Sequence, residues 1–327
     1  MSDAETVLEV RNLQTHFRSR EGVLKAVDDV SFSLKRGQVL GVVGESGSGK
    51  SVTGFSIMRL IDPPGRIVGG EVLYRGRNLI DLSEREMRGL RGNRIAMIFQ
   101  DPMMTLNPVL RVDTQMIEAV RAHTHASTEE ALELARQALT TVGIPGVAER
   151  LKAYPHEFSG GMRQRVAIAI SLLHKPDVIV ADEPTTALDV TIQGQILSEA
   201  QRLARDSGTA MVWITHDLAV VAGLADSVAV MYAGKVVESG SVADILDHPL
   251  HPYTHGLIGS VPSRNIRGQR LRQIPGTTPS LANMPSGCAF RTRCPRATTQ
   301  CAEPPQFAEL AKGHAVRCFH PHIEGMS

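Results

Sequence analysis

Residues 39–51 read Val39-Leu40-Gly41-Val42-Val43-Gly44-Glu45-Ser46-Gly47-Ser48-Gly49-Lys50-Ser51, and this stretch decides the fold. Its first five residues are apolar and mostly β-branched, which predicts a short buried strand. The other eight match the pattern of a phosphate-binding loop, in which glycines let backbone N–H groups curl around phosphates. A helix is expected to follow at residues 52–60. The stretch therefore predicts an α/β protein that binds a nucleotide.

Two side chains of this loop have chemistry of their own. The Lys50 ammonium can reach the β- and γ-phosphates of a nucleotide, and the Ser51 hydroxyl can ligate Mg²⁺. The full pattern, placed between a strand and a helix, is specific for such a site. The residues expected to contact ATP are Gly44, Glu45, Ser46, Gly47, Ser48, Gly49, Lys50, Ser51 and Val52.

A second apolar stretch ends in two carboxylates. Residues 177–181 predict a strand, and Asp182 and Glu183 follow it directly. Asp182 is suited to a water-mediated contact with Mg²⁺, and Glu183 is placed to activate an attacking water as a general base. Such acids can also be a solvated strand end, but the phosphate-binding loop favours the catalytic interpretation.

Two further predicted strands also end in polar side chains. Gln100 follows residues 95–99, and its amide can contact Mg²⁺ or the attacking water. His216 follows residues 211–215, where an imidazole beyond a strand end can hydrogen-bond a γ-phosphate. Each residue alone would be unremarkable, so both assignments depend on the phosphate-binding loop.

Ser159-Gly160-Gly161 forms a second candidate phosphate site, at the start of a helix expected over residues 162–174. The unpaired N–H groups of a helix start can bind phosphate. Ser-Gly-Gly is often only a turn, but here it lies between the phosphate-binding loop and the acidic strand end. One nucleotide on one chain cannot easily use both helix starts. We therefore expect a nucleotide shared between two protein molecules.

The composition excludes several classes of protein. Among 327 residues, Lys and Arg total 35 and Asp and Glu total 34, a balance that argues against a dominant nucleic-acid-binding surface. No apolar run approaches the roughly 18 residues needed to span a bilayer. The N-terminus is acidic with no apolar core behind it, so we expect no signal peptide there. We expect a cytosolic protein whose membrane role is peripheral.

Taken in order, these residues resemble the nucleotide-binding subunit of an ATP-binding-cassette (ABC) transporter over residues 7–245. The signature departs from the usual Leu-Ser-Gly-Gly-Gln, because Phe158 replaces Leu and Met162 replaces Gln, while the serine and both glycines remain. The matching motifs are Walker A at 44–51, the Q-loop at Gln100, the signature at 158–164, Walker B at 178–183, the D-loop Ala187-Leu188-Asp189 and the switch His216.

The resemblance implies an α/β fold, namely a P-loop NTPase cassette with a mixed sheet core, an antiparallel β subdomain and a helical subdomain. It implies a nucleotide-binding domain at residues 1–247, with the helical subdomain at about 101–175, and a C-terminal extension at 248–327. Thr128 is a plausible N-cap for a helix in the helical subdomain, because acidic residues follow it.

The resemblance also implies roles for single residues. Glu183, His216 and Gln100 would be catalytic, and Ser51, Gln100 and Asp182 would hold Mg²⁺. Phe17 would stack on adenine, although it is equally suited to be an ordinary core residue of a strand. In this family two cassettes close head to tail, so that the residues expected to contact the partner's ATP are Ser159, Gly160, Gly161 and Asp189.

All four cysteines lie in the C-terminal extension, at Cys288, Cys294, Cys301 and Cys318. In a reducing compartment such clustering is typical of a metal site, and four thiolates can saturate one tetrahedral or cubane site. The pattern resembles that of dipeptide-importer ATPases with a [4Fe–4S] cluster. Zinc and free thiols remain open alternatives.

Residues 100–108 and the stretch His251-Pro252-Tyr253-Thr254 resemble the oligopeptide/dipeptide importer branch of the family. This implies an ATPase subunit that powers peptide import at the cytoplasmic face of the membrane. Its partners would be a second and related ATPase subunit, two membrane permeases and an extracytoplasmic substrate-binding protein. An oligosaccharide or a nickel chelate is the alternative substrate, and a soluble scaffold ATPase is the alternative class.

Overall fold

The computed structural model describes residues 5–20, 22–186, 188–261 and 273–322. The chain forms two compact units that alternate along the sequence. Among the described residues, no helix combines the length and the apolarity needed to cross a membrane. Unit 1 comprises Met1–Val7, Leu34–Gln38 and Asp81–Trp213, and unit 2 comprises Leu8–Ser33, Val39–Ile80 and Ile214–Ser327.

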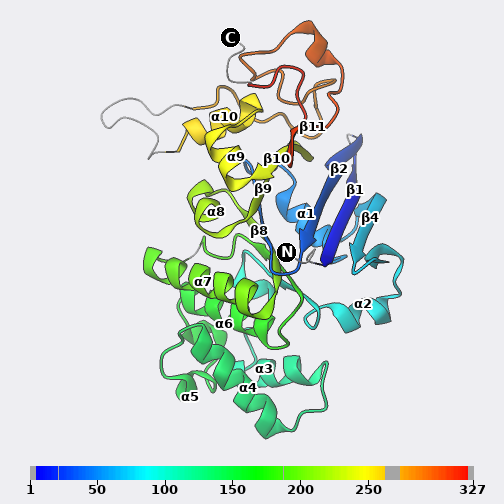
Figure 1. The fold of residues 1–327 in the computed structure, drawn as a ribbon. Helices are drawn as coiled ribbons and strands as arrows, with labels where there is room; N and C mark the ends of the chain where they lie inside the picture. Colours follow the sequence, from blue (N-terminus) through cyan, green and yellow to red (C-terminus); the bar gives the residue numbers. More distant parts are fainter. Residues whose placement is uncertain (1–4, 21, 187, 262–272, 323–327) are drawn as a thin grey trace. The chain divides into compact units, whose positions relative to one another are not determined.

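Unit 2 contains a four-stranded sheet in the order β2-β1-β4-β5, drawn in blue and cyan in Figure 1. The β1–β4 and β4–β5 pairs are antiparallel. This sheet is the antiparallel β element expected from the sequence. Its strands are β1 (Thr6–Ser19), β2 (Gly22–Lys35), β4 (Gly65–Tyr74) and β5 (Arg77–Asn78), and the outermost residues of β1 and β2 belong to unit 1.

A second set of strands in unit 2 runs in the order β11-β12-β10-β9-β3. The buried strand β3 pairs in parallel with β9, whereas β9–β10 and β10–β12 are antiparallel. The prediction of a strand at residues 39–43 is therefore confirmed. The elements are β3 (Val39–Val43), β9 (Ser227–Tyr232), β10 (Lys235–Ser241), β11 (Ala308–Ala311) and β12 (His314–Val316), with helices α1 (Lys50–Ile57), α8 (Leu218–Leu224), α9 (Val242–Asp247) and α10 (Pro252–Gly259).

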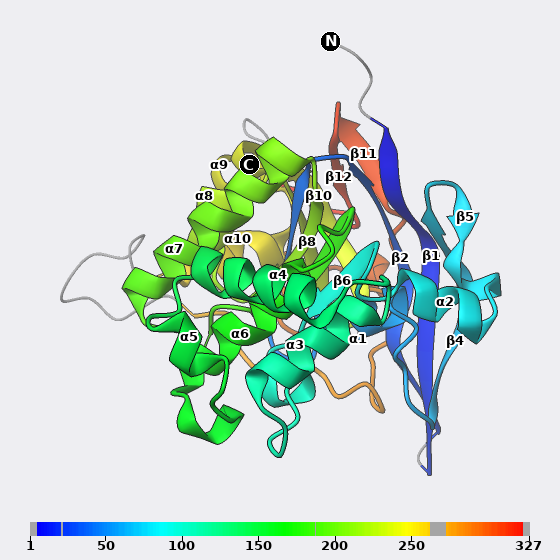
Figure 2. The ribbon, with the colours of Figure 1, turned by 90° about the horizontal axis from the view of Figure 1, so that it is seen from below.

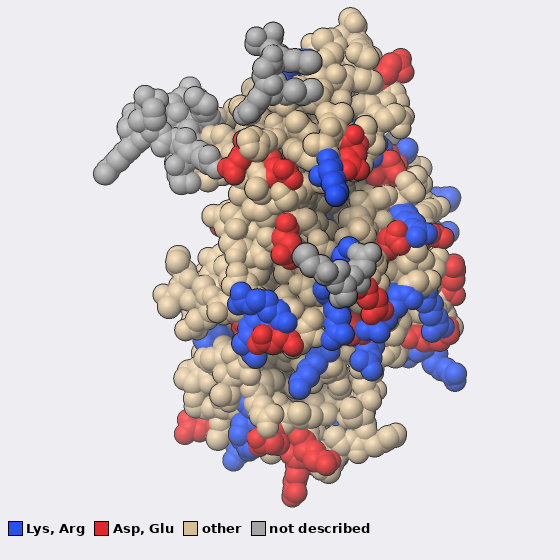
Figure 3. Space-filling model, in the orientation of Figure 1, with Lys and Arg blue, Asp and Glu red and all other residues tan. Residues whose placement is uncertain are grey.

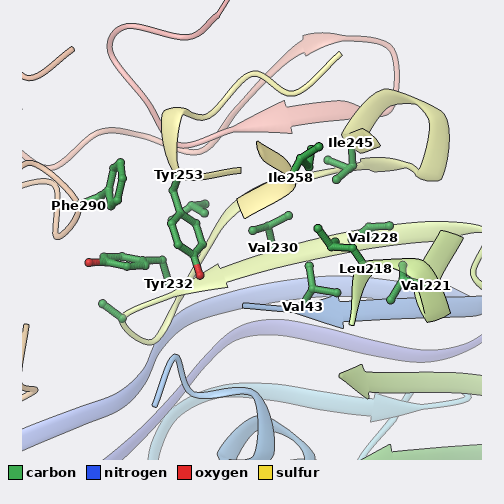
Figure 4. Packing of buried hydrophobic residues seen from close by; sticks show 12 residues of the cluster. Val43, Leu218, Val221, Val228, Val230, Tyr232, Ile245, Tyr253, Ile258 and Phe290 are labelled. Carbon is green, nitrogen blue, oxygen red and sulfur yellow. The ribbon is translucent and has the colours of Figure 1, made fainter. Parts of the chain in front are cut away.

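The C-terminal extension is built into the core of unit 2. Tyr232 of β9, Tyr253 of α10 and Phe290 of the cysteine-bearing segment are all buried in one hydrophobic cluster (Figure 4). The ring centroids of Tyr232 and Tyr253 are 4.6 Å apart, and those of Tyr232 and Phe290 are 5.3 Å apart. Aromatic pairs at such distances stabilise a core beyond their buried area. The extension thus packs against the strand next to β3.

Unit 1 contains the neighbouring strands β7 and β6, which pair in parallel, and the first part of β8. Figures 1 and 2 show its helices α3, α4, α5 and α6 gathered in one group, which is the helical element expected from the sequence. The elements are β6 (Ile95–Ile98), β7 (Val178–Asp182), β8 (Ala210–Thr215), α2 (Glu84–Leu90), α3 (Val112–Arg121), α4 (Thr128–Thr141), α5 (Val147–Arg150), α6 (Gly160–Leu172) and α7 (Val190–Arg202).

One expected helix start is displaced by a residue. The N-cap of α4 is Ser127 and not Thr128, because Ser127 has the extended backbone of a cap and its side chain accepts from the Glu130 N–H. The Glu130 carboxylate accepts in return from the Ser127 N–H at 2.8 Å. This reciprocal capping box outweighs a threonine one position later. Below the cap, α4 buries Ala131, Ala135 and Leu139, as its helical spacing predicts.

Charged side chains of both signs are distributed over the surface. On the face drawn in Figure 3, basic and acidic side chains are interspersed. This agrees with the nearly equal totals of 35 basic and 34 acidic residues.

Candidate functional site: the nucleotide-binding motifs

The phosphate-binding loop, residues 44–51, connects β3 to α1 in unit 2, and its glycines are fixed by packing. Gly49 has a φ of 100°, in the left-handed region that disfavours other residues. A Cβ at Gly49 would lie 2.4 Å from the Ala26 carbonyl oxygen, and one at Gly44 would lie 2.2 Å from the Met231 carbonyl oxygen. The loop therefore tolerates only glycine at both positions.

Lys50, the first residue of α1, turns back over the phosphate-binding loop. It is buried, with 6% of its surface exposed. Its Nζ donates to the carbonyl oxygens of Gly44 at 2.7 Å and Glu45 at 3.0 Å. The ammonium thus lies within the loop that the sequence assigns to phosphate. Ser51, the next residue, is half-buried.

In unit 1, the two carboxylates at the end of β7 have different environments. Asp182 is the last residue of this wholly buried strand and is 3% exposed. Glu183 is half-buried and has a φ of 45°, a conformation that is uncommon for a residue with a side chain. Backbone strain of this kind costs about 1–3 kcal/mol and clusters at active sites. This left-handed conformation turns the backbone at Glu183 out of the strand direction.

Two neutral side chains hold the Glu183 carboxylate. Its Oε2 accepts a hydrogen bond from Thr186 Oγ1 at 3.0 Å and another from Gln100 Nε2 at 3.3 Å. The structure thus brings together two of the residues expected from sequence, Gln100 and Glu183. Thr186 was missed, because a threonine four residues beyond a strand end carries no distinctive pattern.

The signature region forms the start of α6. Ser159 is the N-cap, and its Oγ accepts from the Met162 N–H at 3.3 Å. Phe158 is buried and carries the Arg150 guanidinium 5.7 Å above its ring. The helix therefore begins two residues before the expected start at Met162. The buried side chain of Phe158 lies directly before its N-cap.

The space beside the signature is open. Ser159 and Gly160 are both exposed, and the first turn of α6 contains no acidic residue. A Cβ at Gly160 would meet no atom of the described residues within 4 Å. The packing of the described residues therefore does not require a glycine here. The helix start presents its N–H groups to the outside of the chain.

The same helix reaches the Q-loop. Gln164 is 1% exposed, and its Nε2 donates to the Phe99 carbonyl oxygen at 3.2 Å. Phe99 directly precedes Gln100, whose amide contacts Glu183. A chain of hydrogen bonds thus links the signature helix, through the backbone at Gln100, to the carboxylate at the end of β7.

The remaining expected site residues are placed as follows. His216 is exposed directly after β8, and Asp189 is an exposed N-cap of α7 that accepts from the Ile192 N–H at 3.0 Å. Phe17 is half-buried in β1 and pairs with Gly65 of β4. A Cβ added at Gly65 would lie 2.5 Å from the Phe17 ring. Of the expected D-loop, Ala187 lies outside the described residues.

The expected ligands of Mg²⁺ belong to different units. Ser51 belongs to unit 2, whereas Gln100 and Asp182 belong to unit 1, so their shared Mg²⁺ site stays a prediction.

The four cysteines line one small cavity of about 10 Å³ in unit 2. Burial raises the pKa of the Cys318 thiol to about 11, and it also raises the pKa values of Cys288 and Cys294. Among the described residues, however, no group of three or more His, Cys, Asp or Glu side chains is arranged to hold a metal ion. The expected iron–sulfur cluster is therefore not shown by the structure.

The sequence matches two family models. Residues 27–186 match the model described as "ABC transporter". Residues 237–301 match the one described as "Oligopeptide/dipeptide transporter, C-terminal region". The second match covers α10 and the first three cysteines.

Several curated relatives align over nearly the whole chain. A probable peptide ABC transporter ATP-binding protein of Sinorhizobium fredii is 52% identical, over 97% of this chain and 95% of its own. The oligopeptide transport ATP-binding protein OppD of Escherichia coli is 47% identical, over 97% and 94%. The dipeptide transport ATP-binding protein DppD of Bacillus subtilis is 49% identical, over 96% and 95%.

Solved structures agree with the sequence matches. A dimeric post-hydrolysis state of the ATP-binding cassette MJ0796, bound to ADP and Pi, superposes with a TM-score of 0.66 at 26% identity. The match covers 72% of this chain and 98% of that one. The curated relatives described above are named for transport, so the alternative class for this chain, a soluble scaffold ATPase, is not supported. The chain belongs to the ABC transporter family of ATP-binding proteins, and its most similar curated relatives include those named for oligopeptide and dipeptide transport.

Proposed function

We propose that this protein is the ATP-hydrolysing subunit of an ABC importer for dipeptides and oligopeptides. The observation that carries the proposal is the Glu183 carboxylate at the end of β7, which Thr186 and Gln100 hold by hydrogen bonds. Near full-length similarity to ATP-binding proteins named for peptide transport supports the substrate class. No observation favours an oligosaccharide or a nickel chelate.

In the proposed mechanism, this chain positions ATP and a water molecule. Lys50 binds the β- and γ-phosphates, and Phe17 stacks on adenine. The Ser51 hydroxyl, the Gln100 amide and the buried Asp182 carboxylate provide the hard oxygen donors that suit Mg²⁺. When bound, Mg²⁺ would neutralise phosphate charge.

Glu183 then accepts a proton from the attacking water as the water oxygen bonds to the γ-phosphorus and the bond to ADP breaks. Gln100 and Thr186 orient the carboxylate without competing for the proton, because both are neutral. His216 hydrogen-bonds the γ-phosphate. The products are ADP and inorganic phosphate, and the proton on Glu183 returns to solvent.

The signature is proposed to serve a second chain. The start of α6 presents N–H groups outward beside Gly160, whose missing side chain leaves room for a phosphate. Solved relatives are dimeric cassettes. We assign Ser159, Gly160, Gly161 and Asp189 to ATP bound by the phosphate-binding loop of a partner cassette.

The assembled importer would contain this chain, a related ATPase chain, two membrane permeases and an extracytoplasmic peptide-binding protein. This chain would lie at the cytoplasmic face of the membrane, held there by the permeases. The relatives named for oligopeptide and dipeptide transport support this arrangement.

Uptake of a radiolabelled tripeptide into proteoliposomes tests the proposed function. Vesicles containing the whole importer should accumulate the tripeptide when ATP is supplied on the side of this chain. Vesicles with Lys50→Ala in this chain should accumulate much less. An importer that accumulates a labelled oligosaccharide but no peptide would overturn the substrate class.

A [4Fe–4S] cluster at Cys288, Cys294, Cys301 and Cys318 is a finer part of the proposal. It is supported by the four thiols around one cavity and by the family resemblance. Two of the sulfurs accept backbone N–H bonds, Cys294 from Arg296 at 3.4 Å and Cys318 from His320 at 3.3 Å. Such bonds stabilise thiolate ligands of iron–sulfur clusters.

Protein purified without oxygen should therefore be brown and contain about four iron and four sulfide per chain, as expected for one cubane cluster. Cys301→Ser should lose most of the iron. Iron and sulfide assays and the visible absorption spectrum measure this. Colourless protein with one zinc, or with neither metal, would contradict the cluster.

A further inference from the structure

The second residue of the phosphate-binding loop, Glu45, is held by side chains of the C-terminal extension. Arg293 donates to both carboxylate oxygens, from Nη1 to Oε2 at 2.7 Å and from Nη2 to Oε1 at 3.1 Å. Thr278 Oγ1 donates to Oε2 at 2.6 Å. The Glu45 N–H itself donates to the Tyr253 hydroxyl at 2.8 Å. We call Tyr253, Thr278 and Arg293 the Glu45 brace.

Arg293 is fixed in this position from several sides. Its side chain is only 5% exposed. Its Nε donates to the Pro275 carbonyl oxygen at 2.8 Å, and its Nη1 also reaches the Tyr232 hydroxyl at 3.3 Å. A two-pronged guanidinium–carboxylate pair with further hydrogen bonds is geometrically specific. The brace is therefore a preformed element of unit 2.

The rest of the brace is anchored equally deeply. Tyr253 is fully buried in α10, where His251 is the N-cap and accepts from the Tyr253 N–H at 3.0 Å. The buried Glu238 carboxylate accepts from the Leu250 N–H at 2.7 Å and the His251 N–H at 2.9 Å. The His-Pro-Tyr sequence thus begins a helix that places the Tyr253 hydroxyl on the phosphate-binding loop.

The charges explain why such a brace would be needed. A carboxylate in a loop that binds phosphates repels its own ligand, and the repulsion grows as water is excluded. The Arg293 hydrogen bonds lower the pKa of Glu45, so the carboxylate stays ionised and paired. Without Arg293, the Glu45 carboxylate would be unpaired and would compete with phosphate for the Lys50 ammonium.

We propose that Arg293 is a positioning residue for nucleotide binding, which holds and neutralises Glu45 and thereby fixes the phosphate-binding loop from the C-terminal extension. This inference rests on the proposed binding of ATP at that loop. It gives the extension a part in the nucleotide site in addition to its cysteines.

The test is ATP affinity and turnover of Arg293→Ala in the assembled importer. We expect the Kd and KM for ATP to rise about tenfold, equivalent to about 1.4 kcal/mol, while kcat changes less than twofold. Arg293→Lys should restore part of the affinity, because it keeps one donor and the charge. Adding Arg293→Ala to Glu45→Ala should weaken binding no further, since the two residues act as a pair.

Arg317→Ala is the matched control. Arg317 also precedes a cysteine directly and is 12% exposed, but its guanidinium pairs with Asp29 at 3.0 Å and not with Glu45. We expect unchanged ATP affinity for this variant. Equal loss of affinity in both variants, or none in Arg293→Ala, would overturn the inference. Wild-type protein that binds no ATP would instead overturn the proposed function.

Discussion

Replacing Glu183 with glutamine is expected to reduce ATP hydrolysis at least about a hundredfold, the usual contribution of a general base, while ATP binding is retained. Glutamine keeps the shape of the side chain and can still accept from Thr186 and Gln100. It cannot take a proton from water. The loss should therefore appear in kcat and not in the Kd for ATP.

Hydrolysis at this chain's phosphate-binding loop must be measured alone. This requires an importer whose partner cassette has lost its own catalytic carboxylate, so that the remaining turnover belongs to this chain. Glu199→Gln, on α7 of the same unit, is the control, because the Glu199 carboxylate pairs with Arg202 of the same helix and not with Gln100 or Thr186. Near-normal turnover by Glu183→Gln would remove Glu183 from the role of base.

Much of the fold could be predicted from short apolar runs. The strands at residues 39–43, 95–99, 177–181 and 211–215 were found within one or two residues of their observed ends, because each is buried and ends at a polar motif. The N-cap of α4 was missed by one position. Serine and threonine are both good caps, and only the reciprocal bond to Glu130 distinguishes Ser127.

Less of the site's support could be predicted. Motif spacing identifies Gln100 and Glu183, but it does not show that Thr186 and the left-handed backbone of Glu183 fix the carboxylate. Arg293 is 248 positions from Glu45, and no local pattern connects such distant residues. Pairing across this distance depends on tertiary packing, which a single sequence does not reveal.

Ser159→Arg should abolish hydrolysis at the partner's site while leaving this chain's own ATP binding intact. The arginine would fill the open space at the start of α6, where the partner's γ-phosphate is proposed to bind. Donors of this kind typically contribute about a hundredfold to a thousandfold in rate. Ser127→Arg is the matched control, since Ser127 caps α4 as Ser159 caps α6. It reports the cost of losing a cap alone, about 1 kcal/mol.

The central claim is that the phosphate-binding loop and the signature of this chain serve two different ATP molecules. Vanadate trapping of photoreactive labelled ATP in the assembled importer tests it most directly, because the two cassettes can be separated by size after crosslinking. With Ser159→Arg in this chain, we predict label on this chain and none on the partner. Loss of label from this chain, with label retained on the partner, would contradict the claim.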